Sequence, residues 1–99
     1  MKHFLVEITY TASPEAVAAA RPGHRAHLQT GYDSGMLLFS GPQTPPVGGL
    51  VLARAASLEA VQAFFAQDPF QTSGVATYRF LEFNPVLHQA FLTDWVSGN

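Results

Sequence analysis

The chain has 99 residues, no cysteine and a formal net charge of −2. A chain of this length is expected to form one domain over residues 1–99, and the missing cysteine excludes disulfides, zinc–thiolate sites and thiol nucleophiles. Only five residues are lysine or arginine, which argues against nucleic acids and anionic membranes as partners because phosphate binding needs clustered cations. Charged residues make up 12% of the chain and hydrophobic residues 47%, a composition that predicts an apolar interface between subunits.

The amino end passes directly from Met1 into alternating residues. It has neither the apolar segment nor the small-residue cleavage site of a secretory signal. No apolar run approaches the roughly 18 residues of a membrane-spanning helix. We therefore expect a cytoplasmic protein.

The first two predicted elements are a strand and a long helix. Residues 3–10 alternate between polar and apolar side chains, with the period of a strand that has one apolar face. Ser13-Pro14-Glu15 has the N-cap, first-turn proline and acid of a helix start. Because Pro22 interrupts the helical pattern, we expect this helix to bend or restart near Arg21 and to reach about Ser34, where Gly35 ends it.

Two strands and a second helix are predicted next. Apolar runs over residues 36–40 and 48–54 are separated by a proline-rich loop over 43–47 and predict adjacent strands. Ser57 caps the following helix, and Pro69 is expected to end it. The predicted buried face of this helix comprises Leu58, Val61, Phe64 and Phe65.

The last predicted elements are a strand over residues 74–83 and a carboxy-terminal helix over about 85–96. The spacing of Leu87, Phe91 and Trp95 places them on one helical face, which we expect to dock onto its own subunit or across the dimer, beside the sheet edge.

The order of elements is then β-α-β-β-α-β with a helical extension over 86–99. This order is typical of the ferredoxin-like α+β fold, which has an antiparallel sheet with both helices on one face. The other face could pair with a second copy through Leu5, Tyr78 and Phe80, so we expect a homodimer or a higher homo-oligomer.

Two titratable residues stand where the helical pattern predicts apolar ones. His24 shares a face of the first helix with Val17 and Leu28, and Asp68 continues the buried stripe of the second helix by one turn. We expect the two side chains to lie within hydrogen-bond reach, directly or through one water. An aspartate beside a neutral imidazole fixes its tautomer and raises its basicity, so the pair is a candidate general base. It could instead be a hydrogen-bonded pair that only stabilises the core.

Three further residues are candidates for substrate binding. Arg21, one turn before His24, could bind an anionic group or simply pair with an acid of the chain or with solvent. Ser40, at the end of a predicted strand, could donate a hydrogen bond to a ligand, although serine is also common in turns. Phe70, two residues after Asp68, is expected to line the same site.

Metal binding is a weaker alternative. His24 and His27 are three residues apart on a helix, a spacing that permits two ligands, and Asp68 could be the third. His27 is displaced around the helix, however, and is more simply explained as an exposed or interfacial residue. The chain has no phosphate loop, dinucleotide fingerprint or Gly-x-Ser-x-Gly motif. We expect no metal ion and no other cofactor.

Several short motifs point to a known family when they are taken together. In chain order they are Arg21-Pro22-Gly23-His24, Gly35-Met36-Leu37-Leu38, Gly41-Pro42, Ser57-Leu58-Glu59-Ala60, and Asp68-Pro69-Phe70 followed by Gly74-Val75. In this order and spacing they resemble the YCII-related (YciI-like) family over nearly the whole chain up to about residue 85.

The resemblance implies a dimeric α+β barrel of ferredoxin-like subunits, with a His-Asp pair in a cleft as the active site. His24 and Asp68 are the positions that match this pair. The family is similar in fold to muconolactone isomerases, and its few assigned activities include dehydrochlorination of a chlorinated hydroquinone. This chain departs from the family in the short loop after Gly41-Pro42 and in the extension that carries Trp95.

We therefore expect a small cofactor-independent enzyme, an isomerase or a lyase of the dehydrochlorinase type. His24 would move a proton on a small enolic, phenolic or lactone-like substrate, and Asp68 would orient His24. One alternative is a non-catalytic module of the same fold that binds a small acidic or aromatic ligand. Another is a structural oligomer in which the pair only stabilises the fold.

Overall fold

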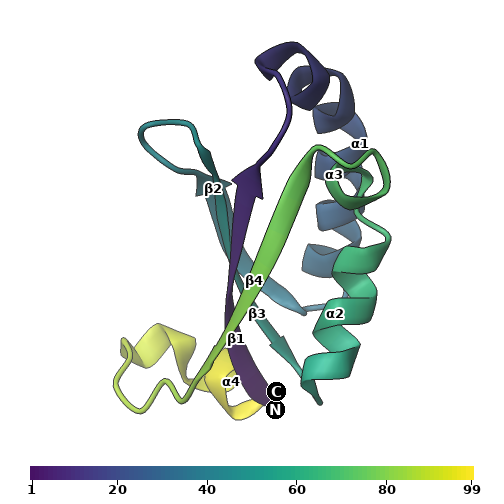
Figure 1. Ribbon diagram of the computed structural model, residues 1–99. Coiled ribbons are helices and arrows are strands. Elements are labelled where there is room, and N and C mark those ends of the chain that lie inside the picture. Colours follow the sequence, from purple (N-terminus) through teal and green to yellow (C-terminus); the bar gives the residue numbers. More distant parts are fainter.

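The computed structural model describes residues 1–99 as a four-stranded sheet with three helices on one face (Figure 1). The strands are β1 (Lys2–Tyr10), β2 (Leu37–Pro42), β3 (Gly48–Ala55) and β4 (Ala76–Phe83). The helices are α1 (Pro14–Asp33), α2 (Leu58–Ala66), α3 (Pro69–Thr72), the 3-10 helix η1 (Ala90–Leu92) and α4 (Thr93–Ser97). None of the helices is long and apolar enough to cross a membrane.

The sheet has the strand order β2-β3-β1-β4, and all neighbouring strands are antiparallel. With α1 and α2 on one face, this is the ferredoxin-like α+β arrangement that the order of elements predicted. The core fills the space between this face and the helices. Phe4, Val6 and Ile8 of β1 are at most 2% exposed, and burying a side chain of this kind contributes about 1.5–3 kcal/mol.

Helix α1 begins where the sequence predicts it, because the Ser13 Oγ accepts a hydrogen bond from the Ala16 N–H at 3.2 Å. The prediction of a restart near Arg21 is wrong, since α1 continues through Arg21 and Pro22 as one helix of 20 residues. A proline removes only one backbone donor from the helix. The carbonyl left without that donor belongs to the exposed Ala18, where water can take its place.

Helix α2 ends at Ala66, three residues before Pro69. The prediction that Asp68 continues the buried stripe of this helix is therefore wrong. Asp68 is instead the N-cap of α3, and its Oδ1 accepts a hydrogen bond from the Phe70 N–H at 3.0 Å. An acceptor followed by proline is a helix start, as at Ser13, and this preference outweighs continuation of the earlier helix.

The pairing of β1 with β4 decides which residues face away from the helices. Tyr78 pairs with Ile8 and Phe80 with Val6, so both aromatic side chains point toward the helices and the prediction that they lie on the other face is wrong. Side chains alternate along a strand, and a change of phase by one residue moves the whole set to the opposite face.

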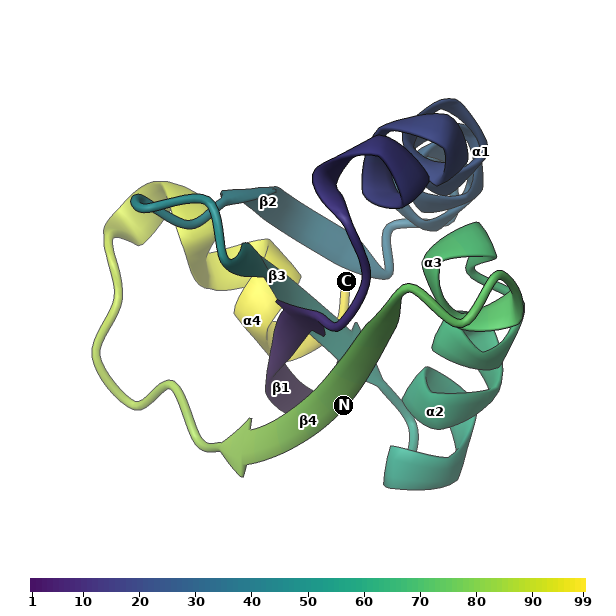
Figure 2. The same cartoon turned by 45° about the horizontal axis from the view of Figure 1, so that its top comes forward.

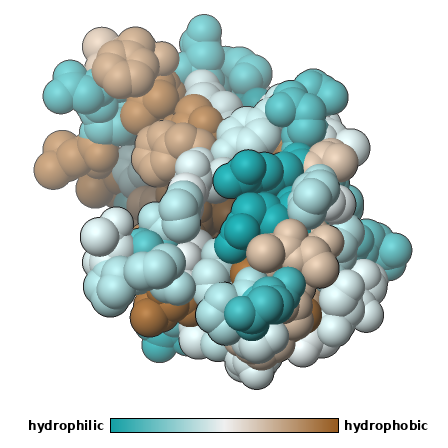
Figure 3. All heavy atoms as spheres, turned by 90° about the horizontal axis from the view of Figure 1, so that it is seen from above, coloured by the Kyte–Doolittle hydropathy of each residue, from teal (hydrophilic) through white to brown (hydrophobic).

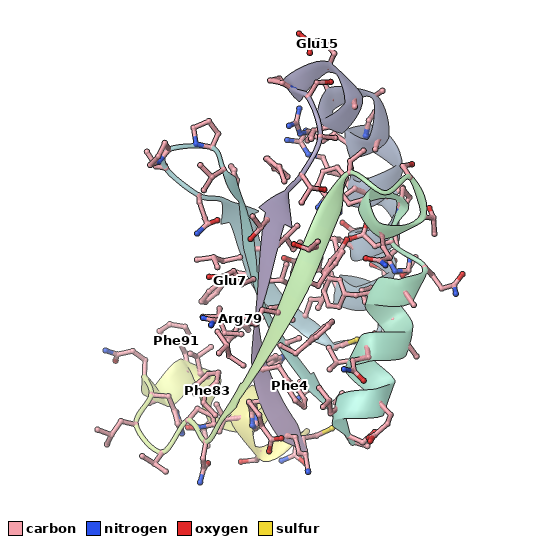
Figure 4. The ribbon with its side chains drawn as sticks, viewed as in Figure 1. Phe4, Glu7, Glu15, Arg79, Phe83 and Phe91 are labelled. Atoms are coloured by element: carbon pink, nitrogen blue, oxygen red, sulfur yellow. The ribbon has the colours of Figure 1, made fainter.

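The helix-free face of the sheet, here called the open face, carries a mixture of apolar and charged residues. Figure 4 shows Glu7 and Arg79 on this side of the sheet and Phe4 on the helix side. The Arg79 Nε lies 3.3 Å from a Glu7 carboxylate oxygen. The apolar residues of the open face, assigned from the strand register, are Leu5, Phe39, Leu50, Leu52, Leu81 and Phe83.

The carboxy-terminal segment leaves β4 and crosses to the β3 side of the open face (Figure 2). The prediction of one helix over about 85–96 is wrong, because only η1 and α4 are helical. Within the subunit, Leu87 and Phe91 are 91% and 83% exposed, and their docking across a dimer stays a prediction. The segment must pass from an edge strand across β1. An extended residue covers roughly twice the length of a helical one, and residues 84–89 form neither helix nor strand.

Trp95 is the residue that attaches this segment to the rest of the molecule. Its Nε1 donates to the Gly35 carbonyl at 3.1 Å, and its ring centroid lies 5.5 Å from that of His3. The buried Arg54 donates from Nη1 to the Trp95 carbonyl at 2.6 Å and to the Asn99 carbonyl at 3.1 Å. The tail is therefore held at one end of the open face.

Candidate functional site

His24 and Asp68 meet where α1 passes α3, although 44 residues separate them in the sequence. The His24 Nδ1 lies 2.8 Å from Oδ1 and 2.9 Å from Oδ2 of Asp68. The Asp68 side chain is fully buried, and 12% of the His24 side chain is exposed. The carboxylate thus lies inside the protein, with the imidazole between it and the surface.

The close approach of α1 to α3 depends on Gly23. A Cβ atom at this position would lie only 3.1 Å from the Cγ of Pro69, tighter than an ordinary contact. The His24 ring stacks on Phe70, with ring centroids 3.9 Å apart and planes inclined by 7°. The imidazole is therefore held on one flat face by Phe70 and at Nδ1 by Asp68.

Asp68 has further hydrogen-bond donors besides His24. Its Oδ1 accepts from the Phe70 N–H at 3.0 Å, and its Oδ2 accepts from the Tyr78 hydroxyl at 2.7 Å. Burial alone raises the pKa of Asp68, but the hydrogen bonds from His24 and Tyr78, the charge of His24 and the Phe70 N–H together outweigh it and lower the pKa. Asp68 is therefore a carboxylate at neutral pH.

Tyr78 is a neutral donor in this network. Burial, and then its hydrogen bond to the charged Asp68, raise the pKa of Tyr78 well above the usual range of a tyrosine. The sequence did not indicate this role, because Tyr78 was expected on the open face. The signal was the phase of alternation in β4, which only the pairing with β1 settles.

The hydrogen bond to Asp68 also determines the tautomer of His24. A carboxylate offers only acceptors, so the neutral imidazole must carry its proton on Nδ1 and keep a lone pair on Nε2. Nε2 of His24 has no hydrogen-bond partner in the protein and is not buried. The accessible nitrogen of His24 can therefore accept a proton from a bound molecule.

A cavity of about 220 Å³ borders His24. Its wall includes Arg21, Ser40 and Phe70, so the three predicted substrate-binding residues share one cavity with the histidine. The Ser40 Oγ lies 2.6 Å from the Tyr32 hydroxyl, which holds the end of β2 close to α1. Asp68 does not line the cavity and acts on its contents only through His24.

Two more residues of the cavity wall were missed from the sequence. Tyr10 lies at the end of β1, with its ring edge-on to Phe70 at 5.7 Å between centroids. Arg25 follows His24 directly and stands four residues after Arg21 on α1. The spacing of the two arginines was the signal that could have found Arg25, since residues four apart share a helix face.

His27 takes part in packing between α1 and α2. Its Nε2 lies 2.7 Å from the Phe64 carbonyl oxygen, and its ring stacks on Phe64 at 4.2 Å between centroids. This nitrogen and the His24 Nδ1 are both engaged within the protein. The described residues contain no group of three His, Cys, Asp or Glu side chains that could hold a metal ion, so His24, His27 and Asp68 do not form a ligand set.

Comparison with known proteins identifies the family. Residues 1–84 match the YCII-related domain. The chain belongs to the YCII-related family. Protein YciI of Escherichia coli O6:H1 (strain CFT073) and Protein YciI of Shigella flexneri are each 39% identical to it over 74 residues, which cover 64% of this chain and 74% of each relative. The resemblance found in the motifs is confirmed, and residues 85–99 lie beyond the matched domain.

A solved structure supports the fold. The 5-chloro-2-hydroxyhydroquinone dehydrochlorinase (TftG) from Burkholderia phenoliruptrix AC1100, in complex with 2,5-dihydroxybenzoquinone, superposes with a TM-score of 0.59. The match covers 82% of this chain and 90% of the other, at 19% sequence identity. This similarity shows that the two proteins share a fold.

Proposed function

We propose that this YCII-related protein is a small enzyme in which His24 acts as a general base and Asp68 orients it. The observation that carries the proposal is the asymmetry of the imidazole. Nδ1 contacts a fully buried carboxylate, whereas Nε2 is unpartnered and accessible beside the cavity. A base prepared in this way contributes about 10²–10⁴-fold to a proton-transfer step.

The proposed reaction starts with neutral His24. Its Nε2 takes a proton from an O–H or an acidic C–H bond, and the Asp68 carboxylate stabilises the imidazolium that forms. In an elimination, the electron pair released by the substrate expels a leaving anion from a nearby carbon. In an isomerisation, His24 returns the proton to a different atom of the substrate. Neither course requires a metal ion or an organic cofactor.

The cavity favours a small planar substrate of the enolic, phenolic or lactone-like class. A volume of about 220 Å³ lies below the range of about 300–1,000 Å³ that suits drug-sized ligands. Phe70 and Tyr10 contribute aromatic surface to its wall. The dehydrochlorinase activity and quinone ligand of TftG, which shares the fold, support a substrate with one six-membered ring.

The proposal is tested with 5-chloro-2-hydroxyhydroquinone as the first substrate and chloride release as the readout. We expect His24→Ala to reduce turnover about 100-fold or more. The matched control is His88→Ala, because His88 is exposed and bonds only to the carbonyl of its neighbour Gln89. Equal turnover by the parental protein and His24→Ala would contradict the proposal for that substrate, and the same pair of variants is then applied to enol-lactones.

The alternative is a non-catalytic ligand-binding module. It is supported by the hydrogen bonds of Asp68 to His24, Phe70 and Tyr78, because groups of the protein alone satisfy this carboxylate. Such a module would bind 2,5-dihydroxybenzoquinone without converting any member of the substrate series. Its affinity would fall in His24→Ala while turnover stayed at the background rate. A purely structural pair would change neither quantity and would lower only the melting temperature.

We further propose that the open face pairs with the open face of a second copy. Phe39 and Phe83 on its two edge strands are 61% and 42% exposed, and Leu5 of β1 pairs with Leu81 of β4. The apolar residues of this face, in a chain with so few charges, favour self-association. A stable dimer should bury at least about 1,000 Å² in total.

The dimer is tested by mass measurements at micromolar concentration. Leu81→Glu places a charge beside Leu5 on the open face and is expected to give a monomer. Val47→Glu introduces the same charge at a 54% exposed position in the β2–β3 loop and should leave the dimer intact. A monomeric parental protein would contradict this part of the proposal.

A further inference from the structure

The five lysine and arginine residues of the chain fall into two groups. Lys2 and Arg79 each lie within 4.0 Å of a glutamate oxygen, and Arg54 donates to three backbone carbonyls. Arg21 and Arg25 take part in none of the ion pairs or side-chain hydrogen bonds of the protein. The two unpaired cations are also the two that line the cavity beside His24.

The cavity wall contains no aspartate or glutamate that could neutralise these arginines. The nearest carboxylate of the network, Asp68, is fully buried behind His24, and both of its oxygens already accept hydrogen bonds. Figure 3 looks onto this end of the molecule and shows strongly hydrophilic side chains gathered near the middle of the face. The cavity therefore presents a positive charge to an entering molecule.

The two guanidinium groups are suited to one common anion. Arg21 and Arg25 are four residues apart on α1, so their Cβ atoms are about 5–6 Å apart on the same side of the helix. His24 lies between them in sequence and borders the same cavity. A guanidinium offers five donors in a planar fork that matches the two oxygens of a carboxylate.

We propose that Arg21 and Arg25 form a carboxylate-binding subsite, so that the molecule acted on at His24 is a small ring compound carrying a carboxylate. The inference deepens the proposed function and rests on it for the role of His24. The carboxylate occupies the arginine side of the cavity, and the ring lies toward Phe70 and Tyr10. The acidic proton then faces the His24 Nε2.

The exposure of the two arginines agrees with this assignment. Arg21 is half-buried and Arg25 is exposed, so both remain hydrated in the empty protein and no buried charge is left unpaired. Binding of a carboxylate replaces this water by hydrogen bonds between charged groups, which are stronger than those between neutral groups. The subsite thus selects for charge in a cavity too small for a large ligand.

The test compares two ligands that share one ring and differ in the charge of the carboxyl group, 2,5-dihydroxybenzoate and its methyl ester, which is neutral and larger by one methyl group. Dissociation constants are measured by calorimetry at low ionic strength, where exposed charges are least screened. We expect the acid to bind about tenfold or more tightly than the ester, as for a charge-assisted hydrogen bond. Arg21→Gln and Arg25→Gln should each remove most of this ratio without changing the affinity for the ester.

The controls separate charge from folding. Arg21→Lys and Arg25→Lys keep the charge and should retain part of the acid-to-ester ratio. Lys2→Gln removes a cation that does not line the cavity and should leave both dissociation constants unchanged. Equal affinity for acid and ester in the parental protein overturns the inference, and so does an unchanged ratio in the double variant Arg21→Gln/Arg25→Gln.

The same ligands distinguish failure of the subsite from failure of the proposed function. His24→Ala leaves both arginines in place, so the acid-to-ester ratio should persist in that variant while turnover is lost. If His24→Ala keeps both the acid-to-ester ratio and the turnover of the parental protein, the role of His24 is rejected and the subsite is retained. If His24→Ala loses turnover but the parental protein binds acid and ester equally, only the subsite is rejected.

Discussion

Two histidines at opposite ends of the sheet have different surroundings. His24 contacts a fully buried carboxylate at Nδ1 and borders a cavity. His3 is buried beneath Trp95, and its Nε2 has no hydrogen-bond partner. Burial alone therefore does not prepare a histidine for proton transfer. A carboxylate on one nitrogen and open space at the other make the difference.

The charges around His3 oppose its protonation. Burial has the largest effect and lowers the pKa of His3, and the positive charges of the Met1 amino group and of Arg54 lower it further. A hydrogen bond with the Val96 backbone raises the pKa but does not outweigh these effects. Arginines are also used differently at the two ends. Arg54 fixes the tail by donating to backbone carbonyls, whereas Arg21 and Arg25 are unpaired at the cavity.

Removing the Asp68 carboxylate should have the largest effect on stability, because it removes the buried acceptor that distinguishes the surroundings of His24 from those of His3. Asp68→Ala leaves the Tyr78 hydroxyl, the Phe70 N–H and the His24 Nδ1 without their common acceptor. We expect the free energy of unfolding in urea to fall by about 3 kcal/mol. Asp94→Ala, at an exposed position, should change it by no more than about 0.5 kcal/mol. A loss below about 1 kcal/mol for Asp68→Ala would contradict the network.

Trp95→Ala is the corresponding change at the His3 end. It removes the half-buried ring beside His3 and the hydrogen bond to Gly35, and we expect a loss of about 2 kcal/mol. Leu87→Ala is the control because this tail residue is 91% exposed. The fluorescence of the single tryptophan should lie to the blue of free tryptophan in water. Equal stability of the two variants would mean that the tail does not stabilise the fold.

The two ends should respond to acid in different pH ranges. The pKa of His3 is lowered from 6.5, so the unfolded chain binds more protons than the folded one just below pH 6.5. The contribution of His3 to stability is therefore full above about pH 6.5 and falls as the solution becomes more acidic. The pKa of Asp68 is lowered from 3.8, so its contribution persists until the pH falls below about 3.8.

Trp95 fluorescence and the ring resonances of Tyr78 report the two events separately during an acid titration. We expect the tryptophan signal to change first and the tyrosine signal only in stronger acid. His3→Gln should abolish the first step and leave the second unchanged. Simultaneous changes in both signals would show that the ends unfold together.

Gly23→Ala should have the smallest effect and tests how closely α1 must approach α3. The added Cβ would lie 3.1 Å from the Pro69 Cγ, so the helices must separate by a few tenths of an ångström. The higher helix propensity of alanine, about 1 kcal/mol, offsets part of this strain. We expect stability to change by about 1 kcal/mol or less while the His24 Nδ1 proton resonance shifts upfield as its hydrogen bond lengthens.

The control for this substitution is Gly41→Ala, where an added Cβ meets nothing within 4 Å. It should leave the His24 Nδ1 resonance in place. An unchanged resonance in Gly23→Ala would show that the hydrogen bond tolerates the separation of the helices.

Much of the fold follows from local patterns in the sequence. The helix caps Ser13 and Ser57 and the turn at Gly35 depend on interactions within a few residues, and the strand over residues 3–10 is marked by its local alternation of polar and apolar side chains. Local patterns failed where two of them competed. Asp68-Pro69 fits the end of one helix as well as the start of the next, and only the short α3 and its hydrogen bonds distinguish the two.

The sequence by itself determined the order of the four strands and of α1 and α2, the YCII-related family and the residues that deserve a test, because these depend on side-chain type and spacing along the chain. Tertiary structure alone decided that Tyr78 faces Asp68, that Trp95 docks while Leu87 does not, and that Arg25 shares a cavity with His24. Each of these depends on the phase and placement of elements far apart in sequence. A strand has two faces that its own residues satisfy almost equally, and only the partner strand and the packed helices select between them.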